Sequence, residues 1–143
     1  MTPVKITIHS ETLGEGAAQP MTLVAFGQLT EKGGTTYVRY AESQVTGMEG
    51  TRTTLKWTED SLTVIRHGRY EHRQQYERGR NSSFQYRTPY FTVPMMVYTR
   101  ELTISRKGHA WQVQVYYDLE MDSQPNGSVR LRIEIEEEEK RGH

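Results

Sequence analysis

The sequence predicts an all-β fold: a single antiparallel, up-and-down β-barrel of about 8–10 strands, forming one domain over residues 1–143. Three observations support this fold class: two-residue alternation in the last third, short turn signals throughout, and no segment with the period of an amphipathic helix. Apolar residues occupy every second position from Trp111 to Met121 and again from Val129 to Ile135. Successive side chains of a strand point to opposite faces, so these segments form a long hairpin with one buried face.

The first half of the chain contains short strands bounded by glycine, proline and small polar residues. They are predicted at residues 4–13, 21–29, 35–43, 51–57 and 61–66. The segment Glu31-Lys32-Gly33-Gly34 predicts a hairpin turn between the second and third strands, because glycine supplies the positive φ that such turns need. The third strand is rich in β-branched and aromatic residues, which favour strands.

The second half continues the pattern with longer strands. They are predicted at residues 69–77, 83–88, 92–105, 111–121 and 129–135. In the first of these, Tyr70, His72, Gln74 and Tyr76 share one face. Most turns join consecutive strands, which favours a meander barrel over a β-sandwich, since a sandwich needs crossover loops. Closure into a barrel also removes the exposed edges of an open sheet of this size.

The composition excludes several classes of site. A chain of 143 residues can bury a core without metal or disulfide support. It contains no cysteine, which excludes disulfides and thiolate metal sites and fits a reducing compartment. The N-terminal segment has no apolar run of signal-peptide length, and no stretch approaches the roughly 18 apolar residues of a membrane helix. The sequence therefore predicts a cytoplasmic protein with no membrane association.

The charges balance overall but not along the chain. Eighteen basic and 18 acidic residues give a formal net charge of zero, which argues against nucleic acid as a partner. Residues 66–107 nevertheless carry 9 basic and 3 acidic side chains. Two interpretations stay open: this basic middle pairs with acidic neighbours across the sheet, or part of it lines an anion site.

Several short stretches follow the pattern of a known family. They are Tyr40-Ala41-Glu42, Val64-Ile65-Arg66-His67-Gly68, Tyr86-Arg87-Thr88-Pro89-Tyr90 and Met96-Val97-Tyr98-Thr99. In this order and spacing they resemble the YwiB-like family of bacterial proteins, whose function is uncharacterised, and the resemblance extends from Ile6 to Glu134. It implies a cytoplasmic, calycin-type, lipocalin-like β-barrel and supplies no activity. The chain departs from the family pattern at Phe91, where a glycine is expected soon after the Thr-Pro pair.

A barrel of this size can hold one small ligand in its interior or mouth, so inward-facing polar residues are the candidates for a site. The candidate ligand-binding residues are Tyr40, Glu42, Arg66, Tyr86 and Arg100. We expect them to share one polar pocket at a barrel end, where an arginine fork holds a carboxylate or phosphate. In the alternative, each pairs with a neighbouring strand and points to water. The predicted function is therefore binding of a small molecule that is polar or anionic at one end; the alternative is a structural or protein-interaction barrel with a packed core and no ligand.

Catalytic and metal-binding motifs are absent from the sequence. It contains no G-x-S-x-G, no P-loop and no dinucleotide fingerprint, and its five histidines lack the spacing of a metal site. We therefore predict no catalytic residue, no metal and no cofactor. Aromatic residues interleave with arginines between Tyr70 and Tyr90, as in barrels that bind single strands, but half-buried sheets share this composition.

An apolar cluster in the eighth predicted strand suggests self-association. Phe91, Met95 and Met96 lie around Pro94, and alternation cannot bury them all on one face. Exposed apolar patches usually mark interfaces, and most soluble homo-oligomers have two-fold symmetry. We predict a homodimer with these residues at its interface.

Overall fold

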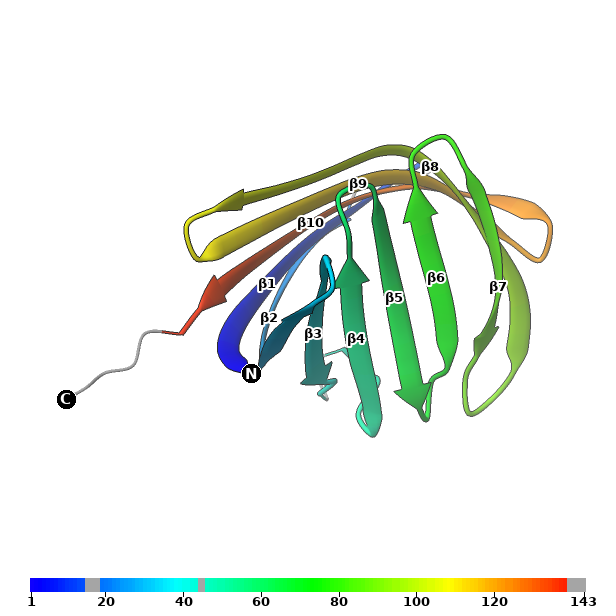
Figure 1. The fold of residues 1–143 in the computed structure, drawn as a ribbon. Helices are drawn as coiled ribbons and strands as arrows, with labels where there is room; N and C mark the ends of the chain where they lie inside the picture. The colour runs from blue at the N-terminus through cyan, green and yellow to red at the C-terminus, as the bar shows by residue number, and fades with distance from the viewer. Residues whose placement is uncertain (15–18, 44–45, 139–143) are drawn as a thin grey trace.

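A computed structural model describes residues 1–14, 19–43 and 46–138, and this part of the chain consists of antiparallel strands joined by turns, without a helix (Figure 1). The strands are β1 (Thr2–Leu13), β2 (Gln19–Lys32), β3 (Thr35–Ala41), β4 (Thr51–Trp57), β5 (Ser61–Gly68), β6 (His72–Glu77), β7 (Asn81–Arg87), β8 (Thr92–Lys107), β9 (Ala110–Met121) and β10 (Gln124–Glu137). No helix in the described residues is long and apolar enough to cross a membrane.

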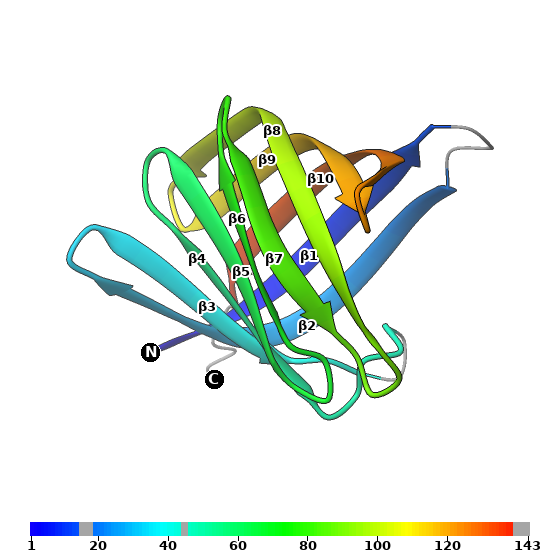
Figure 2. The same cartoon turned by 90° about the vertical axis from the view of Figure 1, so that its right-hand side faces the viewer.

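All of these strands belong to one sheet in the order β6-β5-β4-β3-β2-β1-β10-β9-β8-β7. Consecutive strands pair from β1 to β6 and from β7 to β10, and β1 pairs with β10, where Val4 lies opposite Glu137. The two edge strands, β6 and β7, meet side by side (Figure 2) through one bridge. There Glu71 and Arg87 exchange two backbone hydrogen bonds of 2.9 Å. The predicted all-β, lipocalin-like meander barrel is confirmed, and it is nearly closed.

The inner face of the barrel holds the apolar core. Its buried members include Val4, Ile6, Val38, Leu55, Trp57, Leu62, Val64, Val97, Val113, Val115, Ile133 and Ile135. The predicted hairpin is β9–β10, in which Val113 lies opposite Ile133 and Trp111 opposite Ile135. Burial of each aliphatic side chain contributes roughly 1.5–3 kcal/mol, so this wall carries much of the stability.

The strand predicted over residues 69–77 begins only at His72. Gly68 has a φ of +130°, and a Cβ on it would lie 2.3 Å from the carbonyl oxygen of Gly50. The chain bends after this close contact, so Arg69 and Tyr70 lie outside the strand. His72, Gln74 and Tyr76 share one face, as predicted, and it is the inner face, whereas Tyr70, predicted to share it, lies before the strand.

A bulge between Thr99 and Glu101 reverses the alternation of β8. Before it, the buried residues are Val97 and Thr99; after it, Leu102 and Ile104 pack against the core. One extra residue changes which face each later side chain meets. The bulge therefore leaves Arg100 on the outside of the barrel, where it is exposed.

Gly27 marks the point at which β2 changes its neighbour. β2 pairs with β1 up to Leu29 and with β3 from Gln28 onward. A Cβ on Gly27 would lie 2.3 Å from the carbonyl oxygen of Arg39. Only glycine lets the end of β3 come this close to β2, and this approach brings Tyr40 over the barrel interior.

Candidate functional site

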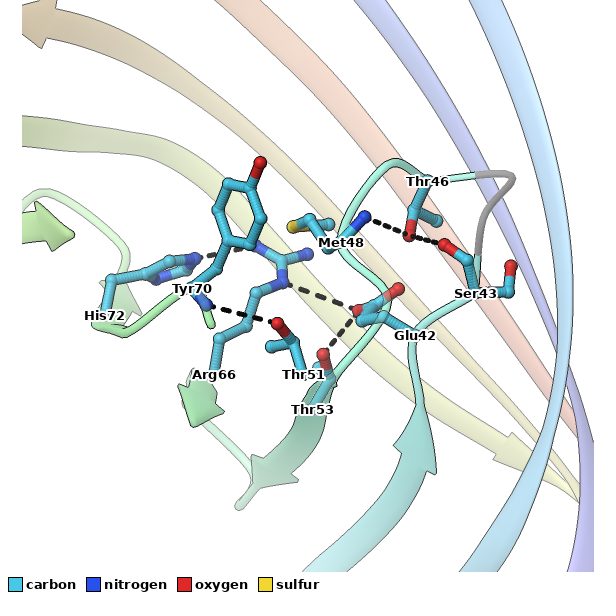
Figure 3. A network of polar contacts seen from close by, with 9 residues as sticks. All are labelled: Glu42, Ser43, Thr46, Met48, Thr51, Thr53, Arg66, Tyr70 and His72. Atoms are coloured by element: carbon cyan, nitrogen blue, oxygen red, sulfur yellow. Dashed lines mark hydrogen bonds and ion pairs between the residues drawn. The ribbon is translucent and has the colours of Figure 1, made fainter. Parts of the chain in front are cut away.

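A row of polar residues crosses the inner face from β3 to β6. Tyr40 is opposite Thr53, Thr53 is opposite Arg66, and Arg66 is opposite His72. Two further side chains complete the group: Glu42 directly after β3, and Tyr86 on β7. We call this group the Arg66 cluster, and it consists of Tyr40, Glu42, Thr53, Arg66, His72 and Tyr86. Figure 3 shows four of its members: Glu42, Thr53, Arg66 and His72.

The guanidinium of Arg66 joins the cluster together. Its Nε lies 3.5 Å from Glu42 Oε2, and its Nη1 donates a 2.7 Å hydrogen bond to His72 Nε2. Thr53 Oγ1 donates to the same carboxylate oxygen. The Glu42 side chain is 1% exposed and that of Arg66 is 22% exposed. The carboxylate of Glu42 is thus shielded from water, whereas part of the Arg66 side chain is exposed to solvent.

His72 is a buried, neutral imidazole. Burial, and then the positive charge of Arg66, lower its pKa from 6.5 to about 3. Because an arginine can only donate, His72 Nε2 accepts, and the ring proton is therefore on Nδ1. Nδ1 is buried and has no hydrogen-bond partner among the described residues. A buried donor left unpaired costs about 1–3 kcal/mol.

Aromatic rings surround this imidazole. Tyr86 stacks on it with centroids 5.2 Å apart and an interplanar angle of 29°, and Phe84 lies 5.6 Å away. Burial also raises the pKa of Tyr86, and burial followed by the Glu42 charge raises the pKa of Tyr40 to about 12. Both phenols therefore keep their protons at neutral pH and can donate hydrogen bonds.

The other predicted residues lie elsewhere. Arg100 is on the outer face, where its Nε donates a 2.8 Å hydrogen bond to Asp118 Oδ2. The structure therefore brings Tyr40, Glu42, Arg66 and Tyr86 together but does not bring Arg100 to them. Of the predicted interface residues, Phe91 is 58% exposed, while Met95 is half-buried against the core and Met96 is half-buried.

The sequence of the chain matches a family described as a domain of unknown function, DUF1934, over residues 6–133. The chain belongs to this family. The fold is similar to that of the crystal structure of ywiB protein from Bacillus subtilis, with a TM-score of 0.84 and 16% sequence identity over 96% of this chain and 93% of that chain. The predicted YwiB-like resemblance is confirmed. No protein with a curated description matches the chain.

The DUF1934 match encloses the whole Arg66 cluster, and two of its members were not among the predicted ligand-binding residues. Thr53 gives no signal in the sequence beyond its place on the buried face of β4. His72 could have been found from the hairpin: β5 and β6 meet around Arg69 and Tyr70, which places Arg66 and His72 opposite each other. Side chains opposite each other in an antiparallel pair lie about 5 Å apart at Cβ.

The chemistry of the Arg66 cluster is that of a hydrogen-bond donor set. Arg66, the Nδ1 of His72 and the phenols of Tyr40 and Tyr86 can donate, whereas the carboxylate of Glu42 accepts. Across the described residues, no group of three or more His, Asp or Glu side chains could hold a metal ion. The arrangement suits an acceptor-bearing group such as a carboxylate, which arginine recognises through paired donors.

Proposed function

We propose that this chain binds a small molecule through a carboxylate or similar anionic group at the Arg66 cluster. The observation that supports the proposal is the unpaired, buried donor at Nδ1 of His72 beside an arginine that is 22% exposed. Unpaired buried polar groups are rare in native proteins, because each costs free energy that a partner would recover. A ligand acceptor would provide that partner.

The burial of Glu42 also favours a binding role over a purely structural one. Replacing a buried ion pair by apolar residues of similar volume is often neutral or stabilising. The same strands carry Leu55, Leu62 and Val64 on the same face, so an apolar row would fit the pattern. A charged row at this position is therefore better explained by recognition than by stability.

Calorimetric titration against a panel of aliphatic and aromatic carboxylates tests the proposal. Arg66→Met should weaken binding of a panel member by about tenfold or more, since a charge-assisted hydrogen bond contributes about 1.5–3 kcal/mol. Arg100→Met is the matched control, because Arg100 is on the outer face and should leave the affinity unchanged.

Native mass spectrometry of protein purified from its own cells should show a retained small molecule on the wild type and none on Arg66→Met. Equal carboxylate affinities of Arg66→Met and Arg100→Met would overturn the proposal. It would also be overturned if no panel member bound and the native mass of the wild type showed no retained molecule. Circular dichroism of both variants checks that the barrel is intact.

A second candidate function, protein interaction through self-association, has its own support. Tyr90 is 79% exposed and Phe91 58% exposed at the turn between β7 and β8. Thr88 Oγ1 accepts hydrogen bonds of 3.1 Å from the backbone N–H groups of both residues, so the backbone that carries the two exposed rings is held in a defined turn. Exposed aromatic groups of this kind are typical of interface anchors.

Sedimentation velocity at micromolar concentration tests this second function. The wild type should sediment as a dimer and a Tyr90→Ser/Phe91→Ser variant as a monomer. A monomeric wild type would remove the homodimer. A cytoplasmic location remains part of the proposal and is supported by the absence of cysteine.

A further inference from the structure

The outer face of β3 to β6 concentrates cationic side chains. Alternation places them there: Arg39 lies between the inward residues Val38 and Tyr40, and Arg52 between Thr51 and Thr53. Together with the end of β2 this surface is called the cationic face, and its cations are Lys32, Arg39, Arg52, Lys56 and Arg73.

None of these cations makes an ion pair with a described carboxylate, although other arginines of the barrel do. On other surfaces, Arg100 pairs with Asp118, Arg106 with Glu31 and Arg132 with Glu134. Neutralising carboxylates usually accompany arginines on a sheet, because opposite charges across strands stabilise it. Because the cations of this face form no ion pairs with described carboxylates, their positive charge is available to bind an anionic partner.

The cationic face is hollowed and carries exposed aromatic surface. A groove of about 1010 Å³ is lined by Lys32, Arg39 and Arg52 together with Phe26 and Tyr37. A second hollow of about 260 Å³ lies beside Lys56 and Arg73. Phe26 is 62% exposed, which is unusual for a phenylalanine unless the ring contacts something else.

The cations are distributed over the outer face from β3 to β6, with uncharged residues between them. Tyr37 is opposite Lys56, and Arg39 is opposite Thr54, which in turn is opposite Ile65 and then Arg73. Adjacent strands are about 4.8 Å apart, so the path from Arg39 to Arg73 covers roughly 14 Å. An extended anionic chain lying across these strands would meet several positive charges in succession.

We propose that the cationic face binds single-stranded nucleic acid. Phosphates would contact the arginines and lysines, and bases would stack on Phe26 and Tyr37, which is how sheets bind single strands without reading sequence. The exposed ring of Phe26 and the half-buried ring of Tyr37 next to the cations favour this partner over an acidic peptide, which has no bases to stack. The face is on the opposite side of the sheet from the Arg66 cluster, so the two proposals are independent.

The zero net charge of the chain does not describe this face. Two carboxylates border its hollows, Glu138 in the groove and Glu77 beside Lys56 and Arg73, while other acidic residues lie on distant strands, for example Asp118 and Glu120 on β9 and Glu134 and Glu136 on β10. Of the interleaved aromatic and arginine residues around 70–90, Arg73 belongs to this face, whereas Tyr76 is 2% exposed and faces the interior.

Fluorescence anisotropy with a labelled, mixed-sequence oligonucleotide tests the proposal. An oligonucleotide of about 16 residues matches the upper range of known site sizes on small barrels. Binding should weaken by about tenfold or more between about 50 and about 200 mM salt. Arg39→Glu/Arg52→Glu should abolish binding at the higher salt concentration, and Phe26→Ser should weaken it about fivefold or more through lost stacking.

The matched control is Lys107→Glu/Arg130→Glu, which makes the same change in charge at exposed residues on β8 and β10. It should retain binding within about twofold of the wild type, since these residues lie outside the cationic face. An equal loss in both double variants would overturn the proposal, because binding would then depend on net charge alone. Equal affinity for polyglutamate of similar length, or no effect of Phe26→Ser, would also overturn it.

Discussion

Arg66 follows Leu62 and Val64 on the inward face of β5, and the alternation of the strand directs its side chain into the barrel. Inside the barrel its guanidinium is hydrogen-bonded because Glu42 contacts Nε and His72 contacts Nη1. The three residues come from different segments and act as one unit. Their energies should therefore be strongly non-additive.

Glu42→Gln should destabilise the fold by about 2–3 kcal/mol, because it leaves a partly buried guanidinium without its counter-ion. Adding Arg66→Met to Glu42→Gln should cost less than the same change in the wild type, with a coupling of about 1–2 kcal/mol. Urea unfolding of the two single variants and the double variant measures this cycle. Additive effects would show that the two side chains do not stabilise each other.

The titration of His72 should make the fold less stable in acid. The folded-state pKa is about 3 and the ordinary value is 6.5, so between these values the unfolded chain binds a proton that the folded chain does not. Stability should then fall by up to about 1.4 kcal/mol for each pH unit below 6.5, and the loss should be complete near pH 3. At and above neutral pH the effect should vanish.

Unfolding free energies of the wild type and His72→Gln at about pH 7 and about pH 5 check this prediction. Glutamine does not titrate and can still accept from Arg66, so the variant should lose less stability on acidification. The difference between the two proteins isolates His72 from His9, His67 and His109, which lie beside carboxylates. An identical pH dependence in both would contradict a depressed pKa.

At the scale of elements, the two-residue alternation of apolar and polar side chains made most strands predictable. Interruptions of this alternation decided which side chains came together inside the barrel. β4 matches its predicted bounds of 51–57, and β9 differs from 111–121 by one residue, because each keeps a strict inward and outward rhythm. In β8 the apolar positions change from odd to even numbers at the bulge, which explains why Arg100 left the predicted pocket. Once the bulge is known, the shift from Val97 to Leu102 and Ile104 as core positions can be recognised in the sequence.

Pairing between strands was harder to predict than the strands themselves. Tyr40 and Glu42 were correctly placed on the face of Val38, since two-residue alternation is local. The contact between Arg66 and His72 depends on where the hairpin turns, and the strained Gly68 moved that turn by two residues. Register of this kind depends on backbone contacts between distant residues, which no local pattern records.

Gly27→Ala should be strongly destabilising, since the new methyl group would lie 2.3 Å from the carbonyl oxygen of Arg39. We expect a loss of about 2–4 kcal/mol, in the range of overpacked or strained sites. Gly33→Ala is the control: it has a φ of +59° and nothing within 4 Å of its Cβ. It should cost only about 1 kcal/mol for the left-handed backbone. Similar melting temperatures for both variants would rule out a close approach of β2 and β3.

In the whole molecule, the two proposed sites occupy opposite faces of the same strands. On β3, Tyr40 faces the Arg66 cluster and Arg39 the cationic face; on β4, Thr53 and Arg52 divide in the same way. Residues one position apart therefore belong to different sites. The Arg39→Glu/Arg52→Glu variant should retain carboxylate binding, and Arg66→Met should retain oligonucleotide binding.

The pairing of β1 with β10 brings the first and last described residues together in the middle of the sheet, where the N–H of Glu138 donates a 2.9 Å hydrogen bond to the carbonyl of Pro3. The edges of the sheet, β6 and β7, are consecutive in the chain. A circular permutant that links the termini and opens the chain between Arg78 and Gly79 would thus run from one edge of the sheet to the other, with every ladder joining consecutive strands and the Glu71–Arg87 bridge left as a long-range contact. We expect it to form the same barrel and to fold faster than the natural order of strands, since folding rate rises as contacts become more local.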